Sequence, residues 1–309
     1  MLILFASISY YARSCGFEVI VNYNTKALTK SCIESIFSET CGIEFEVILV
    51  DNASSDGSKE LFQIDERIIF IESNVNLGFG KANNLGYKYA TGKYIFLLNS
   101  DTLLKNNAIK LFFDFAEKMD HSIACVGTLL LGNDGEFIHS CAKFPSLKSI
   151  FCQLLNQYTS LIGWDISGYN LNLKEVHFPK VVDYITGADL FIRRDVVEQL
   201  GLFNPLFFMY YEETEMQYRY RSMGYFSVLI NTPKILHLNG IKKKKRTMKG
   251  MYISTEGCFT YSKLVFGKYR YYLVRAMFLF FLTPKLLLFP ASLKDKKDYA
   301  KLLLMFKGC

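Results

Sequence analysis

The feature that most constrains the fold is a regular alternation of apolar runs and amphipathic stretches in the first half of the chain. The runs at 17–24, 45–52, 67–73 and 93–101 have the length of strands. Their apolar residues are largely continuous, as in strands that are buried on both faces. The pattern predicts an α/β fold with a mostly parallel, doubly wound sheet and helices on both faces.

The segments between these runs carry helix signals. The first helix is expected to begin at Asn24 or Thr25 as its N-cap, and further helices are expected within 54–64, at 79–90 and at 106–119. The 309 residues, 50% of them apolar, suffice for a large core. The eight cysteines form no CxxC pair, which argues against a zinc site or a disulfide scaffold and favours a reducing compartment.

Polar residues follow three of the expected strands directly. They are Asn22-Tyr23-Asn24, Asp51-Asn52 and Asn99-Ser100-Asp101. One such cluster is usually a turn or a helix cap, but three on successive strands are harder to explain in that way. Because ligands of open α/β sheets bind at the carboxyl ends of the strands, these clusters indicate a binding site.

A glycine turn lies between the third and fourth runs. Its sequence, Gly78-Phe79-Gly80-Lys81-Ala82-Asn83, has asparagine where a dinucleotide fingerprint needs glycine or alanine, and it follows the third strand instead of the first. A nicotinamide-dependent dehydrogenase is therefore a poor fit. The backbone N–H groups of the helix that begins near Gly80 are still suited to bind a phosphate.

These motifs together carry a resemblance to a known family. "VIVNYNT", "VILVDNASSDGS", "NVNLGFGKANN" and "IFLLNSDT" occur in this order, followed by "ITGADLFIRRDVVEQLGLFNPLFFMYYEETEMQYRYRSMGYFSVLI". Over about residues 17–240 the chain resembles a family 2 glycosyltransferase, of the rhamnosyltransferase-like branch that builds bacterial surface polysaccharides. The resemblance implies a GT-A domain at 17–240, after an N-terminal extension at 1–16 and before a basic, apolar, helical tail at 241–309.

The resemblance also implies a donor site and a metal. It assigns donor binding to Tyr23, Asp51, Gly78, Gly80, Asn83, Asn99 and Asp101. The usual Asp-x-Asp metal motif falls on Asn99-Ser100-Asp101, so Asp101 is the one certain carboxylate there. His237 matches a position near the diphosphate or the metal. A divalent ion, Mg²⁺ or Mn²⁺, needs only one or two protein carboxylates when donor phosphates complete its shell.

The chemistry of the implied reaction requires a base for the acceptor hydroxyl. Glu212 and Glu213 follow an aromatic segment, and the resemblance gives the role of base to the second acid, Glu213, with Glu212 as the alternate. A carboxylate with an ordinary pKa near ~4 is ionised at neutral pH and accepts the proton. Asp189 falls at the family's acceptor-side position. His121, His139 and His177 have no motif around them and are expected in solvent or in the core.

The implied function is inverting transfer of a sugar from a nucleoside-diphosphate donor, dTDP-rhamnose first and a UDP-hexose next, to a glycan acceptor linked to polyprenyl diphosphate. A nucleotidyltransferase should carry a glycine-rich, basic phosphate loop near the first strand, and "VNYNTKALTK" is not one. The departures at Asn99 and Glu213 leave a further alternative, a catalytically degenerate scaffold protein of a polysaccharide assembly complex.

The C-terminal tail differs in charge from the rest. Residues 241–309 hold 16 basic and 3 acidic residues, and residues 1–240 hold 20 and 26. The run at 242–246 and the apolar segment at 271–293, broken by Arg275, Pro284 and Lys285, predict a segment that lies on an anionic membrane surface with its basic side chains at the headgroups. The predicted location is cytoplasmic, peripheral on the inner face of the plasma membrane, with no nucleic acid as partner. A helix packed on the catalytic domain is the alternative.

Overall fold

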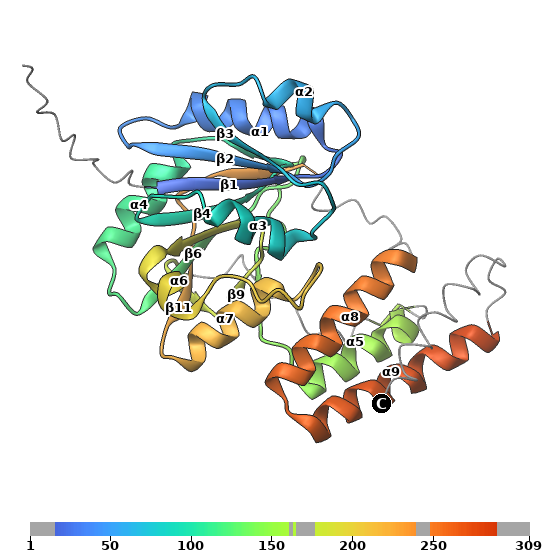
Figure 1. Cartoon of the computed structure of the whole chain (residues 1–309). Coiled ribbons are helices and arrows are strands. Elements are labelled where there is room, and N and C mark those ends of the chain that lie inside the picture. The colour runs from blue at the N-terminus through green and yellow to red at the C-terminus, as the bar shows by residue number, and fades with distance from the viewer. Residues whose placement is uncertain (1–15, 161–162, 165–176, 239–247, 289–309) are drawn as a thin grey trace, which may run out of the picture.

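The structure, a computed structural model, describes residues 16–160, 163–164, 177–238 and 248–288 (Figure 1). The expectations for the N-terminal extension and for the basic run at 242–246 therefore fall outside the described residues, apart from Gly16. Residues 289–309 lie outside them too.

One eight-stranded sheet forms the centre, in the order β3-β2-β1-β4-β10-β6-β11-β8. Its strands are β1 (Gly16–Asn22), β2 (Phe45–Asp51), β3 (Ile68–Glu72), β4 (Tyr94–Asn99), β6 (Ile123–Thr128), β8 (Lys180–Val182), β10 (Asp189–Arg193) and β11 (Phe226–Ile230). Strands β1 to β4 pair in parallel, as do β6 and β11, whereas β10 and β8 run antiparallel to their neighbours. The mostly parallel sheet is confirmed, and the four predicted strands are β1 to β4.

Helices cover both faces of this sheet, as predicted. One face carries α1 (Lys26–Glu39), α2 (Ser58–Phe62) and α4 (Ala108–Lys118), and the other carries α3 (Phe79–Tyr87), α6 (Arg194–Leu200) and α7 (Glu212–Ser222). The spacing of Cys32, Ile33 and Ile36 explains the orientation of α1, because these three side chains share one side of the helix and are all buried. Two small two-stranded sheets complete the domain, β5 (Thr102–Leu104) with β12 (Ile235–His237) and β7 (Cys141–Ala142) with β9 (Tyr184–Ile185).

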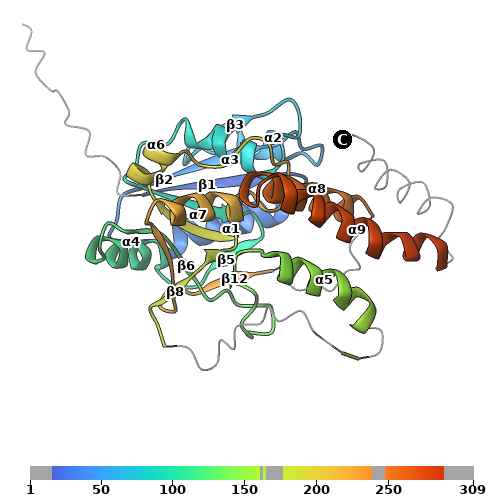
Figure 2. The same cartoon turned by 90° about the horizontal axis from the view of Figure 1, so that it is seen from below.

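Three more helices form a separate layer beside the sheet (Figures 1 and 2). They are α5 (Leu147–Thr159), α8 (Met248–Val265) and α9 (Lys268–Leu288). Ile150 and Leu154 of α5, Phe259 of α8, and Val274 and Phe281 of α9 share one small buried cluster. The described part of the tail is therefore helical, and α9 runs through Pro284. None of the helices in the described part of the chain is both long enough and apolar enough to cross a membrane.

The orientation of Arg275 corrects the sequence analysis. Its side chain was expected to reach lipid headgroups, but only 7% of the residue is exposed. Arg275 Nη1 donates a hydrogen bond to the Tyr271 hydroxyl at 3.1 Å, and the guanidinium lies over the rings of Phe259 and Tyr271. A planar, weakly hydrated guanidinium is suited to such stacking, so this basic residue stabilises the helical layer from inside.

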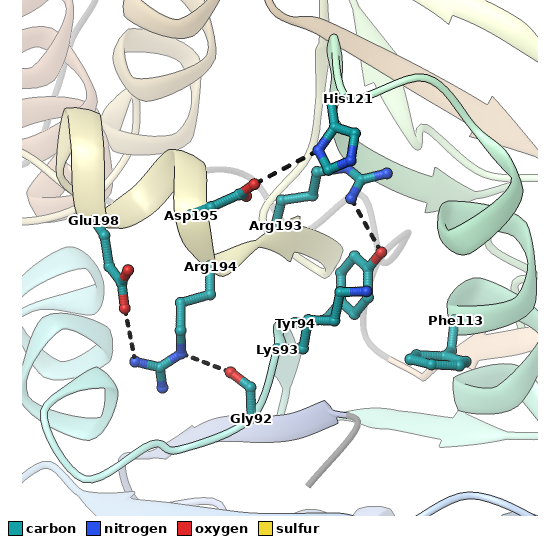
Figure 3. Close-up of a pocket in the computed structure, with 9 residues that line it drawn as sticks. All are labelled: Gly92, Lys93, Tyr94, Phe113, His121, Arg193, Arg194, Asp195 and Glu198. Carbon is teal, nitrogen blue, oxygen red and sulfur yellow. Dashed lines mark hydrogen bonds and ion pairs between the residues drawn. The ribbon is translucent and has the colours of Figure 1, made fainter. Parts of the chain in front are cut away.

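A buried polar anchor, Arg193, lies at the opposite end of the sheet from the strand-end clusters. Arg193, which ends β10, donates from Nε to the carbonyl of Ile123 at 2.9 Å and from Nη2 to the carbonyl of Ala116 at 2.7 Å. Its Nη1 donates to the Tyr94 hydroxyl at 3.2 Å (Figure 3). A cavity of about 480 Å³ lies beside it, but the guanidinium is fully used by main-chain carbonyls and a tyrosine. Arg193 thus ties the end of α4 to the sheet.

We expect Arg193→Leu to lower the free energy of unfolding by about 3 kcal/mol or more, because it leaves buried carbonyls without donors. The matched control is Arg67→Gln, since the Arg67 side chain is 44% exposed in its ion pairs with Glu34 and Asp65. An exposed pair contributes about 1 kcal/mol or less. Urea unfolding of both variants measures the difference, and equal losses would contradict the assignment of Arg193 as the anchor.

Candidate active site

The structure brings the three polar strand ends together. The register of β1 and β2 sets Asn22 beside Asp51, and the register of β1 and β4 sets Val21 beside Asn99. Asn22 Nδ2 donates to Asp51 Oδ1 at 2.6 Å, and the backbone N–H of Ser54 donates to Asp51 Oδ2 at 3.0 Å. Both oxygens of Asp51 are therefore engaged, and the residue is only 2% exposed. In this arrangement Asp51 fixes the strand ends and presents little surface to a ligand.

Tyr23 lies on the rim of the same edge with an exposed ring. The two loops that form the rim are bonded to each other. The backbone N–H of Asn24 donates to Ser54 Oγ at 3.0 Å, and the backbone N–H of Ser55 donates to Asn24 Oδ1 at 2.8 Å. An exposed aromatic ring on a fixed loop offers a flat stacking surface.

The glycine turn approaches a second segment of the chain very closely. The N–H of Phe79 donates to the carbonyl of Phe208 at 2.9 Å. Gly78 has φ +80°, and a Cβ there would lie 1.9 Å from that carbonyl oxygen, so no other residue fits this contact. Gly80 faces Glu212 across the same interface, at 3.5 Å from an added Cβ to the Glu212 Cβ. Asn83 is 1% exposed and donates to the carbonyl of Phe79, so it stabilises the helix and does not reach a pocket.

Asp101 and His237 lie together, although 136 positions separate them in the chain. Antiparallel pairing of β5 with β12 sets His237 beside Thr102. His237 Nε2 is 3.1 Å from Asp101 Oδ1, and both side chains are largely buried. The backbone N–H of Leu238 also donates to the carbonyl of Asp101 at 2.9 Å.

This pair fits a divalent ion that the donor helps to bind. Within the described ranges no three His, Cys, Asp or Glu side chains group closely enough to hold a metal by themselves. A carboxylate and an imidazole are a donor set that Mn²⁺ accepts, and Mg²⁺ also binds through one or two carboxylates when ligand phosphates supply the remaining oxygens. The protein alone should therefore bind the ion weakly.

A pocket of about 410 Å³ adjoins this pair. It is lined by Asn99 at the end of β4, Gly187 before β10, His237 of β12, Phe79 of α3, and Glu212 and Glu213 of α7. Of the site residues selected from the sequence, four line this pocket, and they come from three separate segments. Asp101 itself lies behind His237 and is not part of the wall.

The two glutamates begin α7 after a strained turn. Tyr210 and Tyr211 both have positive φ, +71° and +70°, which costs about 1–3 kcal/mol for each non-glycine residue. Burial raises the pKa of Glu213 to about 7. Burial and then the charge of Glu213 raise the pKa of Glu212 well above its ordinary range, and Glu212 Oε2 has no hydrogen-bond partner. The ordinary pKa near ~4 assumed from the sequence is wrong for both acids, because the pocket removes their water.

Asp189 lies below the pocket instead of on its surface. It is the first residue of β10 and has no exposed surface. The N–H of Thr128 donates to Asp189 Oδ2 at 2.6 Å, whereas Oδ1 has no partner. Burial therefore raises the pKa of this carboxyl well above its ordinary range. The pocket wall is formed instead by Thr186, Gly187 and Ala188, which precede it.

Several residues of the pocket were not selected from the sequence, among them His139, Met209 and Tyr210. His139, expected in solvent or core, lines the pocket beside Ile138, and Met209 and Tyr210 line it from the turn before α7. The aromatic segment before Glu212 was a signal for Tyr210. No local pattern marks His139, because it reaches the pocket through a loop after β6.

Comparison with known proteins identifies the family. The family model "Glycosyl transferase family 2" matches residues 19–200. The chain is 28% identical over 207 residues to the low-salt glycan biosynthesis hexosyltransferase Agl10 of Haloferax volcanii, covering 66% of this chain and 60% of that protein. It is 26% identical over 204 residues to the N-acetylglucosaminyl-diphospho-decaprenol L-rhamnosyltransferase of Mycobacterium tuberculosis, covering 62% of this chain and 66% of that protein. The aligned part spans less than two thirds of either relative.

Solved glycosyltransferase structures share the fold. The mannosyltransferase PcManGT from Pyrobaculum calidifontis, solved with GDP-Man and Mn²⁺, aligns with a TM-score of 0.53 at 13% identity, over 97% of this chain and 76% of that one. GalNAc-T7, solved with UDP, GalNAc and Mn²⁺, aligns with a TM-score of 0.60 at 14% identity, over 95% and 55%. The expected GT-A fold is thereby confirmed. Because the family model covers more than half of the sequence, including all three strand ends and the glycine turn, the chain belongs to glycosyl transferase family 2.

Proposed function

We propose that the protein is an inverting glycosyltransferase that moves a hexosyl residue, rhamnose as the first candidate, from a nucleoside-diphosphate donor to a hydroxyl of a lipid-linked glycan. The observation that supports this proposal is that Glu213, His237 and Asn99 at the carboxyl end of β4 line one pocket. A base and a diphosphate site within one pocket are what a single displacement requires.

The donor is held by groups from several segments. Tyr23 offers its exposed ring to the nucleobase, and the Asp51 network fixes the loop that carries it. The N–H groups of α3 after Phe79, whose own N–H is donated to the Phe208 carbonyl, are those left for the diphosphate. Asp101 and His237 would hold a divalent ion, which would neutralise the charge that builds on the leaving diphosphate.

The raised pKa values separate the roles of the two glutamates. Glu212 is buried with an unpartnered oxygen, and burial followed by the charge of Glu213 raises its pKa well above the ordinary range, so it holds its proton more strongly. Glu213, with a pKa of about 7, is ionised in a large fraction of molecules at neutral pH. A base whose pKa lies near the working pH combines availability with proton affinity. Glu213 therefore takes the proton of the acceptor hydroxyl while the oxygen attacks the anomeric carbon and the diphosphate leaves.

The finer assignments rest on the relatives. The mycobacterial relative is named as a rhamnosyltransferase that acts on a diphospho-decaprenol glycan. By analogy we assign dTDP-rhamnose, or next a UDP-hexose, as donor, and a polyprenyl-diphosphate-linked glycan as acceptor. Such an acceptor stays in the bilayer, so the enzyme belongs on the cytoplasmic face of the plasma membrane. The test is a screen of purified protein with Mn²⁺ and a panel of nucleotide sugars, read by binding and by slow donor hydrolysis.

The scaffold alternative rests on two departures from the family pattern, the asparagine at position 99 and the glutamate at position 213. A scaffold that evolved from a transferase could still bind a nucleotide sugar. The same screen separates the two functions, because a transferase hydrolyses one donor slowly in the presence of the metal and a scaffold hydrolyses none.

We expect Asp101→Asn to abolish Mn²⁺-dependent donor binding and transfer while the protein remains folded, because an amide has lost the charge that holds the ion. Asp114→Asn is the matched control, since Asp114 lies on α4 and pairs with Lys110. Calorimetry with the donor, with and without a chelator, provides the measurement. Activity that survives in Asp101→Asn or in excess chelator would exclude the metal assignment.

For the base, we expect Glu213→Gln to keep donor affinity and to lose at least about 100-fold in kcat, whereas Glu212→Gln stays near normal. In the unsubstituted protein the base acts only when it is unprotonated, so kcat/KM should fall about tenfold per pH unit below the pKa of Glu213 and level off above it. If Glu212→Gln were inactive and Glu213→Gln active, Glu212 would be the base. Activity in both would place the base elsewhere.

Stability provides the control for these variants. Because both pKa values are raised in the folded protein, the folded state is favoured at low pH and loses stability as the pH rises from the ordinary pKa towards the raised one. Glutamine does not ionise, so replacing either acid with it removes this loss of stability with rising pH. The melting temperature at pH 8 should therefore stay equal or rise, so a loss of activity is not a loss of fold.

A further inference from the structure

The outward side of α9 is an apolar stripe. Tyr269 is 89% exposed and Phe280 is 72% exposed, and Tyr272, Leu273 and Leu279 lie exposed between them. These positions follow one another at helical spacing through the exposed Ala276, so they occupy one side of the helix. The opposite side packs inward through Val274 and Phe281. Figure 1 shows α9 at the outer edge of the helical layer.

The charged side chains of α9 have one sign. Residues 268–288 hold basic residues and no acidic one, whereas α8 carries the exposed Glu256. Lys268 and Arg270, which flank Tyr269 in the sequence, are both exposed. An aromatic and apolar surface bordered by cations is complementary to an anionic lipid headgroup layer.

We propose that this side of α9 lies on an anionic phospholipid surface, with Tyr269, Tyr272, Leu273, Leu279 and Phe280 between the headgroups and Lys268 and Arg270 at the phosphates. An interfacial position agrees with the finding that none of the described helices can span a bilayer. This proposal names the residues that make the membrane contact, and it rests on the proposed function for its biological purpose. Its test needs no transferase activity, so the two can fail separately.

The experiment uses the full chain and flotation with vesicles. One set contains phosphatidylcholine alone, and the other contains phosphatidylglycerol as well. The apolar variant is Leu273→Gln/Phe280→Gln, and its control is Ile64→Gln, since Ile64 is 73% exposed on the catalytic domain. The basic variant is Lys268→Gln/Arg270→Gln, and its control is the exposed Lys118→Gln on α4.

We expect the unsubstituted chain to float with the anionic vesicles at low salt and to be partly released by high salt. The apolar variant should partition about tenfold less, and the basic variant should lose binding at low salt only, while both controls stay within about twofold of the unsubstituted chain. Donor binding should be equal in all of them.

Three results would overturn the proposal. The full chain could fail to float at low salt. The apolar variant could float like the unsubstituted chain, which would place the contact at 241–247 or 289–309. Light scattering could show that the unsubstituted chain is a dimer and the apolar variant a monomer, while the two float equally. That result would make a second copy of the chain the partner of α9.

A different observation links the helical layer to the base. Gly257 of α8 lies against the strained turn, where an added Cβ would be 2.7 Å from the Tyr210 carbonyl oxygen and 3.1 Å from the Tyr211 ring. The Tyr211 ring also packs on Tyr261, one turn further along α8, with 5.7 Å between the ring centroids. Two successive residues with positive φ persist only where their surroundings enforce them.

We infer that Gly257 is a positioning residue for the base. The glycine lets α8 approach the backbone of Tyr210 and Tyr211, and this contact holds the turn from which Glu212 and Glu213 enter the pocket. Truncating the chain at Gly240 would remove α8, and with it the contact that holds this turn, as well as α9. The vesicle experiment therefore uses point variants of α9.

The test variant is Gly257→Ala, and Lys263→Ala on the exposed side of α8 is its control. Alanine is the better helix former, so the substitution should not unfold α8. We expect hydrogen exchange of the first-turn amides of α7 to quicken about tenfold, because the turn loses its fixed geometry. We also expect kcat to fall about tenfold while the donor KM stays within about twofold.

Unchanged exchange in α7 would overturn the assignment whether or not the protein is a transferase. Equal losses in kcat and donor affinity would overturn it as well, because they would indicate a general structural role. Should Gly257→Ala fail to fold, Tyr261→Leu removes the ring under Tyr211 without adding bulk at the turn. It must then quicken the same exchange for the assignment to stand.

Discussion

The pocket depends on one close approach of two backbone segments at Gly78. The carbonyl of Phe208 sits where a side chain at position 78 would have to be, and it accepts the N–H of Phe79. This contact closes the segment that carries Met209 and the two glutamates over the start of α3. Without it, the acids would not face the end of the sheet, and the pocket would lack one wall. A single position without a Cβ thus permits the geometry on which the chemistry depends.

The electrostatics of the pocket follow from the same closure. Two adjacent carboxyl groups withdrawn from water cannot both ionise readily, because each loses solvation and each repels the charge of the other. Glu212, with an unpartnered oxygen, keeps its proton more strongly, and Glu213 is left to titrate near neutral pH. The closure that creates the pocket therefore also divides the acids into one that stays neutral and one that can act as a base.

Local sequence patterns predicted much of the fold, whereas the rest depends on pairings between segments that are far apart in the chain. Continuous apolar runs revealed β1 to β4, since burial on both faces leaves that trace in the sequence. The antiparallel β10 inside the sheet, and the burial of Asp189 at its start, left no comparable trace. The pairing of Asp101 with His237 was reached by resemblance alone, because it depends on two short strands far apart in the chain. His139 and the inward stacking of Arg275 depend on tertiary packing and were missed or wrongly expected.

The helical layer connects the exposed apolar stripe of α9 to the pocket. Helix α8 contacts the turn before α7 on one side and packs with α9 on the other, so the outward stripe of α9 and Glu213, the proposed base, belong to one packed unit. If the acceptor is anchored in a bilayer as proposed, its hydroxyl lies at a limited height above the headgroups. The proposed contact of α9 with the same surface would then hold Glu213 at a limited height too. Under both proposals the encounter is a search in two dimensions with the orientation already provided.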